Sequence, residues 1–313
     1  MRFTVTIDHS QNTPIVKLKD TITQTEAEIY SFGGLLNAFN IQLNNKTFNC
    51  IEGFNSVADV QQNITNGFKS AKIAPFVCRL KNGEYNFNDT HYKTHKFYLG
   101  EHAIHGLVYD QVFEILTTHA DEHHATVGLR CKYTGTDAGY PFAFELLINW
   151  KLEINNKLSV TTTVLHHNKH AIPFADGWHP YFTLGTDVDD YYVAFDSNTQ
   201  IEFDASLIPT DKELKDERFI HSTSLKNIAL DNCFVLNNPG QSTCILRNKQ
   251  LQLTIHPEKS YPYLQIYTPP HRKSIAIENL SSIPDAFNNK KGLIWLEPNQ
   301  SKLFTTSYQI TIL

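Results

Sequence analysis

The sequence predicts an all-β protein, built as one large antiparallel sandwich with few short helices. Three observations support this prediction: apolar and polar residues alternate in several segments, tight-turn residues recur between them, and helical patterns are scarce. The chain has 313 residues, of which 41% are hydrophobic, so it is long enough to bury a large core. All-β sandwiches of this size often form one domain, and we expect residues 1–313 to do so.

Four segments alternate apolar or β-branched residues with polar ones, which predicts half-buried strands because every second side chain of a strand points to the same face. In chain order they are RFTVTI at 2–7, LSVTTTVL at 158–165, LQLTIH at 251–256 and LFTTSYQITI at 303–312. Turn residues punctuate the chain in LKNGEY at 80–85, EINNKL at 153–158, NNPGQ at 237–241 and LEPNQSK at 296–302. Asn, Gly and Pro favour tight turns, so this spacing indicates consecutive antiparallel strands.

The strongest helical segment is NSVADVQQNITNGFKS at 55–70. Its glycine and β-branched residues predict one or two short turns rather than a long helix. The sequence contains no internal repeat and no Pro/Gly/Ser-rich linker that would divide the chain.

The charge of the chain disfavours two classes of partner. Its 27 basic and 32 acidic residues give a net charge of −5, without a run of five or six like charges, so nucleic acids and anionic membranes are not expected partners. The N-terminal MRFTVTIDHS lacks the apolar region of a secretion signal, and no stretch of about 18 apolar residues predicts a membrane span. We expect a cytoplasmic protein.

Cysteine and histidine patterns give no indication of a metal. The five cysteines are odd in number and lack a CxxC motif, so free buried thiols are expected rather than disulfides or a thiolate zinc site. The 15 histidines include no HExxH motif, and the His-His pairs at 123–124 and 166–167 are predicted to be solvated loop residues. Adjacent residues of a strand point to opposite faces, which disfavours ligation by such a pair. We expect no cofactor and no metal.

Two residues are candidates for catalysis. Glu278 lies in SIAIENL at 274–280, which reads as a buried strand, and an unpaired buried carboxylate is costly, so this residue needs a partner or a role. The alternative is a surface-facing glutamate at a strand end. His179 lies in ADGWHPYF at 175–182, between aromatic residues. A structural histidine in an aromatic turn is its alternative.

Four further residues are candidates for binding, each with a structural alternative. Arg79 follows the apolar IAPFV, and its planar guanidinium suits ligand hydroxyls or a structural salt bridge. His105 precedes Gly106, as a site residue or as a turn at a strand end. Asp231 in ALDNCF suits hydroxyl groups or an Asx-turn, and Gln265 in YLQIY suits a ligand or the outward face of a strand.

The order and spacing of these segments closely resemble the aldose 1-epimerase (mutarotase) family. GWHPYF matches the G-x-H-P-Y-F signature of the family, and IENLSSIPDAFNN resembles the segment that holds its catalytic glutamate. The resemblance runs from about Phe68 to the C-terminus, and IYSFGGLLN at 29–37 looks like an early strand of the family. It implies a galactose mutarotase-like β-supersandwich.

The resemblance also implies the residue roles: Glu278 as general base, His179 as general acid, and contacts to sugar hydroxyls by Arg79, His105, Asp231 and Gln265. The implied reaction interconverts the α and β anomers of an aldohexose. The base removes the C1 hydroxyl proton while the acid protonates the ring oxygen, so the ring opens and can close on the other face.

The implied chemistry sets expectations for charge and partners. Unperturbed pKa values of about 4.3 for Glu and about 6.5 for His suit an ionised glutamate and a protonated histidine, and a neighbouring carboxylate should raise the pKa of the imidazole. The expected partner is a small sugar, and the expected state is a monomer or a homodimer.

Two departures from the family leave the sugar open. Cys78 stands where family members often carry Asn before the binding arginine, and HGLVYDQVFEI at 105–115 lacks the second glycine common among galactose mutarotases.

Two alternative functions also stay open. A hexose-6-phosphate 1-epimerase would need basic residues at the pocket mouth, for which Lys72, Lys81 and Arg272 are available. A non-catalytic sugar-binding or sensing protein would be expected to lose the acid or the base.

Aromatic residues of the GWHPYF segment, Trp178, Tyr181 and Phe182, are predicted to pack in the core rather than stack on a sugar.

Overall fold

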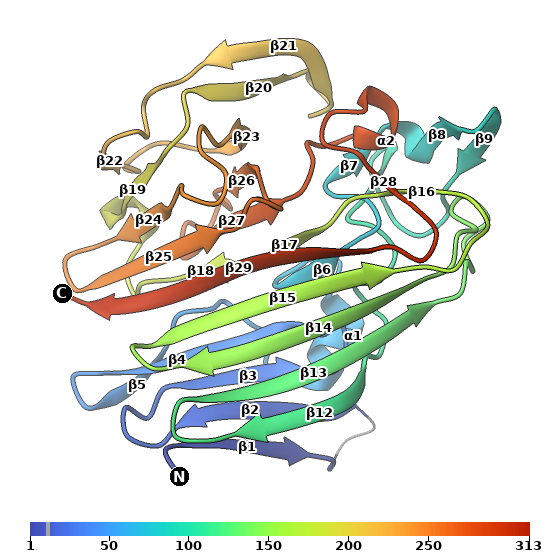
Figure 1. Cartoon of the computed structure of the whole chain (residues 1–313). Helices are drawn as coiled ribbons and strands as arrows, with labels where there is room; N and C mark the ends of the chain where they lie inside the picture. Colours follow the sequence, from blue (N-terminus) through green and yellow to red (C-terminus); the bar gives the residue numbers. More distant parts are fainter. Residues whose placement is uncertain (11–12) are drawn as a thin grey trace.

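The computed structural model describes residues 1–10 and 13–313 and confirms the all-β prediction (Figure 1). The described residues form three large sheets and three small ones. Within each sheet, neighbouring strands are antiparallel, as the turn residues between them predict. The four strands predicted from alternation correspond to β1, β15, β25 and β29.

A nine-stranded sheet forms one side of the molecule, and its order places the last strand of the chain, β29, next to β15 (Figure 1). Its strands in spatial order are β12 (Glu114–Ala120), β13 (His124–Tyr133), β14 (Phe144–Glu153), β15 (Lys157–Leu165), β29 (Ser301–Ile312), β25 (Leu251–Pro257), β24 (Cys244–Arg247), β19 (Tyr192–Phe195) and β22 (Thr223–Ser224).

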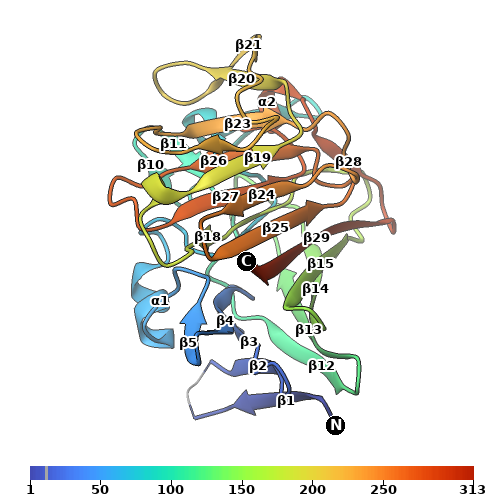
Figure 2. The ribbon, with the colours of Figure 1, turned by 90° about the vertical axis from the view of Figure 1, so that its left-hand side faces the viewer.

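Two further large sheets pack against this one. The five-stranded sheet contains β1 (Phe3–Asp8), β2 (Ile15–Asp20), β3 (Glu26–Tyr30), β4 (Leu36–Leu43) and β5 (Lys46–Asn49). The eight-stranded sheet contains β21 (Pro209–Lys215), β20 (Thr199–Phe203), β23 (Asp231–Val235), β26 (Tyr263–Tyr267), β27 (Ile275–Leu280), β17 (Gly177–His179), β6 (Ala71–Ile73) and β18 (Tyr181–Phe182). In Figure 2, the eight-stranded sheet lies at the top and the five-stranded sheet at the bottom, with β12–β15 and β29 along one flank.

The remaining elements are short. The small sheets pair β7 (Arg79–Leu80) and β10 (Tyr98–Leu99) with β11 (His102–Ile104), β8 (Glu84–Phe87) with β9 (Thr90–Lys93), and β16 (Ile172–Phe174) with β28 (Ile294–Leu296). Helix α1 (Val57–Asn63) is the short helix predicted within 55–70, and Ser56 caps it by accepting a hydrogen bond from the Asp59 backbone. Helix α2 (Ala286–Asn289) and two 3₁₀ turns (Lys81–Gly83, Val188–Asp190) complete the described structure.

Alternation along the strands builds the core. In β15 every second residue is buried, from Leu158 to Val164, while the residues between them are partly exposed. The largest cluster of buried hydrophobic side chains extends in sequence from Phe3 to Ile310. Because strands from both ends of the chain contribute to this cluster, we propose that residues 1–313 form one domain.

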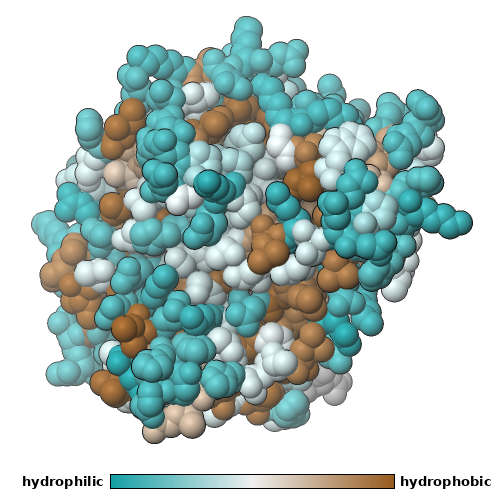
Figure 3. Space-filling view, viewed as in Figure 1, coloured by the Kyte–Doolittle hydropathy of each residue, from teal (hydrophilic) through white to brown (hydrophobic). Residues whose placement is uncertain are grey.

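On the face shown in Figure 3, hydrophobic residues lie in small groups among hydrophilic ones, which is ordinary for a protein surface. No helix in the described part of the chain is long and apolar enough to cross a membrane. The cytoplasmic location and the monomer or homodimer stay predictions.

A buried ion pair lies behind strand β17. Lys72 and Asp176 are both fully buried, and Lys72 Nζ lies 2.5 Å from Asp176 Oδ1. The hydroxyl of Tyr261 donates to the same oxygen at 2.6 Å, and Lys72 Nζ lies 4.5 Å from the centroid of the Trp178 ring. Burial lowers the pKa of Lys72 to about 8, against the attraction of Asp176. This network joins β6 to the segment that precedes the GWHPYF motif.

The structure places two residues that the sequence left open or placed wrongly. Lys72, one of the basic residues considered for the pocket mouth of a hexose-6-phosphate 1-epimerase, is fully buried in the ion pair with Asp176. His166 was expected to be solvated, but only 1% of its surface is exposed, and its buried Nε2 donates a hydrogen bond to the Leu296 carbonyl at 2.7 Å. Asp176 is 104 residues from Lys72, and Leu296 is 130 residues from His166, so the local sequence pattern could not reveal either contact.

Breaking the ion pair should destabilise the fold. Asp176→Asn leaves Lys72 without a counter-charge, and we expect the free energy of unfolding to fall by about 3–5 kcal/mol. The double variant Lys72→Met/Asp176→Asn buries no charge and should lose less. Urea denaturation followed by tryptophan fluorescence measures both values, and an equal loss in the two variants would contradict this role of the charge.

Candidate active site

All six residues predicted for the site line one cavity. Its volume is about 270 Å³, and its lining includes the predicted set: Arg79, His105, His179, Asp231, Gln265 and Glu278. Four of these residues come from the eight-stranded sheet, Arg79 comes from β7, and His105 comes from the loop after β11. Segments that are distant in sequence therefore meet at one cavity.

Strand register places His179 beside Glu278. In the pairing of β17 with β27, Gly177 is opposite Leu280 and Trp178 is opposite Asn279, so the same register brings His179 opposite Glu278. On the other side of β27, Glu278 is opposite Gln265 of β26. Directly opposite residues of antiparallel strands point to the same face, so these three side chains form one row along the cavity wall.

His179 and Glu278 are in direct contact. The Nε2 atom of His179 lies 3.3 Å from Oε1 of Glu278, and both side chains are almost completely buried. The ring of Tyr181 stacks on the imidazole of His179, with centroids 5.1 Å apart. The imidazole is therefore held between an aromatic ring and a carboxyl group.

The small sheet places Cys78, Arg79 and His105 on the opposite side of the cavity. Strand β7 pairs with β11, with Arg79 opposite Ile104, and the backbone N–H of His105 donates to the Cys78 carbonyl at 3.0 Å. Cys78 and His105 have φ values of 48° and 60°, in the left-handed region that non-glycine residues rarely adopt. Gly106 lies so close to Ala74 that an added Cβ would be 2.1 Å from the Ala74 carbonyl oxygen. The strained turn fixes the direction of both side chains.

Gln265 and its neighbour Asp231, beyond Glu278 in this row, offer polar groups that can bind a ligand. Gln265 Nε2 donates to Asp231 Oδ1 at 2.8 Å, whereas Gln265 Oε1 is buried without a partner. In the ion pairs of the described residues, Arg79 has no partner, so the structural salt bridge considered for it is not found there. Asp231 also accepts no bond from Asn232; instead its backbone N–H donates to the Asn232 side chain at 3.3 Å.

Burial sets the charge of the catalytic candidates. Burial raises the pKa of Glu278 well above its ordinary value, and the nearby Asp231 raises it further, while Cys78 and Arg79 act in the opposite direction. Burial lowers the pKa of His179 to about 4. Burial also lowers the pKa of His105 well below its ordinary value, with His179 and Arg79 contributing. Burial thus shifts both pKa values in the direction that favours the uncharged carboxyl group of Glu278 and the uncharged imidazole of His179.

The lowered pKa of His179 differs from the sequence-based expectation. The sequence suggested that the neighbouring carboxylate raises the pKa of the His179 imidazole, but the loss of hydration is the dominant effect on both groups. The pair still offers one proton donor and one proton acceptor, and the 3.3 Å between them allows the proton to sit on either residue.

Several aromatic residues of the cavity were missed or assigned to the core. Tyr181 was expected to pack in the core, yet it lines the cavity together with Phe68 and Tyr267. Tyr267 lies two residues after Gln265, so strand alternation alone places both on one face and could have found it. Trp178 and Phe182 do pack in the core, against Trp150 and Tyr308.

The cavity offers little support for binding a phosphate. Within the part of the chain that the structure describes, Arg79 is the one Lys or Arg in the lining. Of the three basic residues considered for a phosphate, Lys72 is buried with Asp176, the Lys81 side chain is exposed, and Arg272 pairs with Asp189 at 2.8 Å.

Comparisons with known proteins identify the family of the chain. Residues 14–309 match the family described as aldose 1-epimerase. The uncharacterized protein YihR of Escherichia coli is 28% identical over 247 residues, which is 75% of this chain and 77% of that protein.

Solved structures share the fold at low identity. The galactose 1-epimerase of Lactobacillus acidophilus superposes with a TM-score of 0.84 at 16% identity, covering 100% of this chain and 99% of that one. A galactose mutarotase-like protein of Clostridium acetobutylicum gives a TM-score of 0.86 at 18% identity, with the same coverage. The fold is therefore galactose mutarotase-like. Because the family match extends over nearly the whole chain, this protein belongs to the aldose 1-epimerase family.

Proposed function

We propose that the protein is an aldose 1-epimerase that interconverts the α and β anomers of an unphosphorylated aldohexose. The observation that carries this proposal is the contact of His179 with Glu278 at 3.3 Å on the wall of a cavity with several free polar groups. A proton donor and a proton acceptor side by side are what ring opening requires. Membership of the family supports the same reaction.

Glu278 acts as the base and His179 as the acid. Transfer of the pair's proton from Glu278 to His179 gives the reactive carboxylate and imidazolium, and the positive charge of Arg79 favours the carboxylate. Glu278 then takes the proton of the C1 hydroxyl while His179 protonates the ring oxygen. After rotation about C1–C2, the two roles reverse and the ring closes. The pair therefore holds the same number of protons at the end of the cycle as at its start.

The other residues of the lining hold the sugar. Arg79, Asp231 and Gln265 offer charged and neutral groups to sugar hydroxyls, and the single free acceptor of Gln265 is buried, so binding satisfies it. Tyr181 and Tyr267 offer aromatic surface to apolar C–H groups of the ring. The cavity of about 270 Å³ is slightly smaller than ordinary ligand sites of roughly 300–1,000 Å³, which favours one sugar unit over an oligosaccharide.

The scarcity of lysine and arginine in the lining favours an unphosphorylated sugar over a hexose 6-phosphate. A non-catalytic sugar sensor is disfavoured because such a protein has no need of a buried acid–base pair, whose burial is costly.

Removing the base should abolish most of the activity. Glu278→Gln keeps the shape of the side chain but cannot accept the C1 proton, so we expect kcat to fall by about 10²–10⁴-fold. The exposed Glu213→Gln on β21 is the matched control and should keep the activity. Polarimetry of freshly dissolved α-D-glucose and α-D-galactose measures the rate. Full activity of Glu278→Gln would rule out this assignment.

The activity should extend well above the ordinary pKa of histidine. Below about pH 4 His179 becomes protonated while Glu278 also keeps its proton. Neither group can then accept the C1 proton, so activity is lost on the acid side. On the alkaline side the pair loses its proton only above the raised pKa of Glu278, so activity persists through neutral pH. The pH profile of kcat/KM, corrected for spontaneous mutarotation, tests this expectation. A decline centred near 6.5 would instead indicate a solvated imidazole.

Replacing the cavity's arginine should weaken sugar binding more than chemistry. Arg79→Met removes hydrogen bonds from a charged donor to the sugar, each worth about 1.5–3 kcal/mol, so KM should rise about 10–100-fold. Initial rates over a range of sugar concentrations separate KM from kcat. An unchanged KM would show that Arg79 does not contact the sugar.

A further inference from the structure

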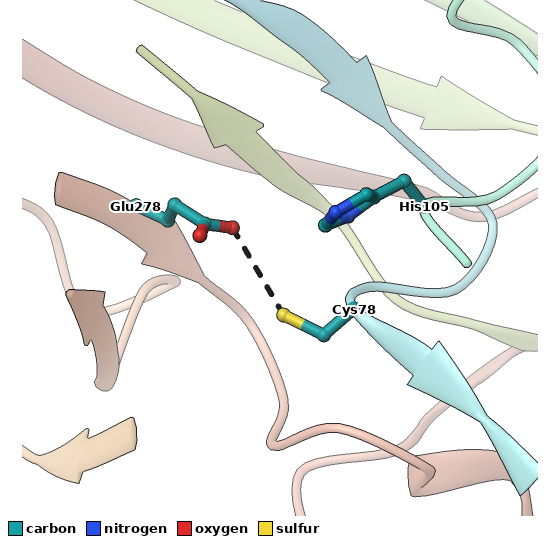
Figure 4. A group of neighbouring side chains, drawn as sticks. All are labelled: Cys78, His105 and Glu278. Atoms are coloured by element: carbon teal, nitrogen blue, oxygen red, sulfur yellow. Dashed lines mark hydrogen bonds between the residues drawn. The ribbon is translucent and has the colours of Figure 1, made fainter. Parts of the chain in front are cut away.

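Cys78, His105 and Glu278 form a close group of potential metal ligands in the cavity. One ligand atom from each of Cys78, His105 and Glu278 can be chosen so that all three lie within 4.8 Å of one another. Figure 4 shows the three side chains directed toward a common space, Glu278 from strand β27, Cys78 from the loop before β7 and His105 from the loop after β11. The Sγ atom of Cys78 lies 3.9 Å from Oε2 of Glu278.

We propose that this cluster binds a thiophilic divalent transition metal, with Zn²⁺ as the best fit. Thiolate, imidazole and carboxylate are the three ligand types that zinc takes in proteins. A thiolate excludes Mg²⁺ and Ca²⁺, which prefer oxygen ligands alone.

The three ligand atoms lie within 4.8 Å of one another and would have to draw together around a metal. With Zn–S of about 2.3 Å and Zn–N or Zn–O of about 2.0–2.1 Å, tetrahedral ligand atoms lie about 3.3–3.6 Å apart. The present separation of 3.9 Å between Cys78 Sγ and Glu278 Oε2 needs to close only slightly. Because all three residues line the cavity, a metal bound by them would have an open fourth position there, as in zinc sites that keep one open position.

The three side chains of the cluster are deeply buried, which is costly for polar groups that bind no ligand. Cys78, His105 and Glu278 are 6%, 5% and 2% exposed. The Nδ1 atom of His105 is buried without a hydrogen-bond partner, and the proposed reaction makes no use of the Cys78 thiol. The two left-handed backbone conformations at Cys78 and His105 hold both side chains toward Glu278.

The charges also balance. A thiolate at Cys78 and a carboxylate at Glu278 together carry two negative charges, and His105 coordinates as a neutral ring, so a bound Zn²⁺ leaves the buried site uncharged. The thiol proton and any carboxyl proton leave to solvent when the metal binds.

A bound metal would occupy the proposed base. Coordination of Glu278 prevents it from taking the C1 proton, so the metal and the sugar compete for the cavity and the metal inhibits the reaction. This inhibitory role rests on the proposed function, whereas the metal site itself does not.

Cobalt titration of the whole chain tests the site without any turnover. The protein is freed of metal with a chelator and titrated with Co²⁺, which replaces Zn²⁺ and gives a thiolate-to-metal charge-transfer band in the near ultraviolet. We expect a saturable band at one equivalent in the native chain and its loss in Cys78→Ser. Glu278→Gln should weaken the binding, which gives a second variant if Cys78→Ser does not fold by circular dichroism.

Two control variants separate this site from other metal-binding groups. Cys131→Ser removes another buried thiol, and His119→Ala removes one member of a surface group of His119, Asp121 and His124 that could also hold a metal. Both controls should keep the band. Absence of a band in the native chain, or a band that persists in Cys78→Ser, would overturn the proposal.

The inhibitory role has its own measurement. Saturating Zn²⁺ should lower the rate of mutarotation by about 10²-fold or more, since the base is lost, and a chelator should restore it. If neither glucose nor galactose is turned over while the cobalt band forms, the proposed function fails and the metal site stands. If the sugars are turned over and no band forms, the metal site fails alone.

Discussion

The pairing of β17 with β27 is the constraint on which the site depends. This register alone brings His179 opposite Glu278, and a slip by one residue would turn every side chain of the short strand β17 to the other face of the sheet. Two buried interactions hold the register from the core side. Thr306 of β29 donates to Asn279 at 2.7 Å, and the Lys72–Asp176 pair joins β6 to the segment before β17. The core therefore determines the geometry of the cavity.

The same sheet separates two kinds of buried polar group. On the core side, Lys72 and Tyr261 both bond to Asp176 Oδ1, so the charge of Asp176 is matched and its role is structural, while Asp176 Oδ2 and Asn279 Nδ2 have no hydrogen-bond partner among the described residues. On the cavity side, His179 and Glu278 have each other, while one nitrogen of His179 and one oxygen of Gln265 lack partners. Buried groups without partners are costly, and a cavity is where a ligand can satisfy them. The site therefore differs from the structural network behind it in that His179 and Gln265, which carry unpartnered atoms, line a cavity that a ligand can enter.

The sequence predicts the strands and the main site residues for different reasons. Alternation has a period of two, so β1, β15, β25 and β29 could be located from local composition. The roles at His179 and Glu278 came from a family resemblance, since their contact depends on pairing between distant strands. For the same reason the burial of Lys72 and the cluster at Cys78 could not be predicted: Cys78 and Glu278 are 200 residues apart in sequence and meet only in the folded chain. The pKa of His179 was wrongly predicted because the family resemblance implies a carboxylate beside the imidazole, whereas the loss of hydration cannot be read from the sequence.

The central claim is that His179 and Glu278 act as one unit that shares a single proton. A double-mutant cycle measures this most directly, with the α to β exchange of glucose and galactose followed by magnetisation-transfer NMR for the native chain, Glu278→Gln, His179→Gln and the double variant. If the two residues form one unit, the double variant will be little slower than the slower single variant. If the two losses multiply, the residues act independently, and the account of a shared proton is contradicted.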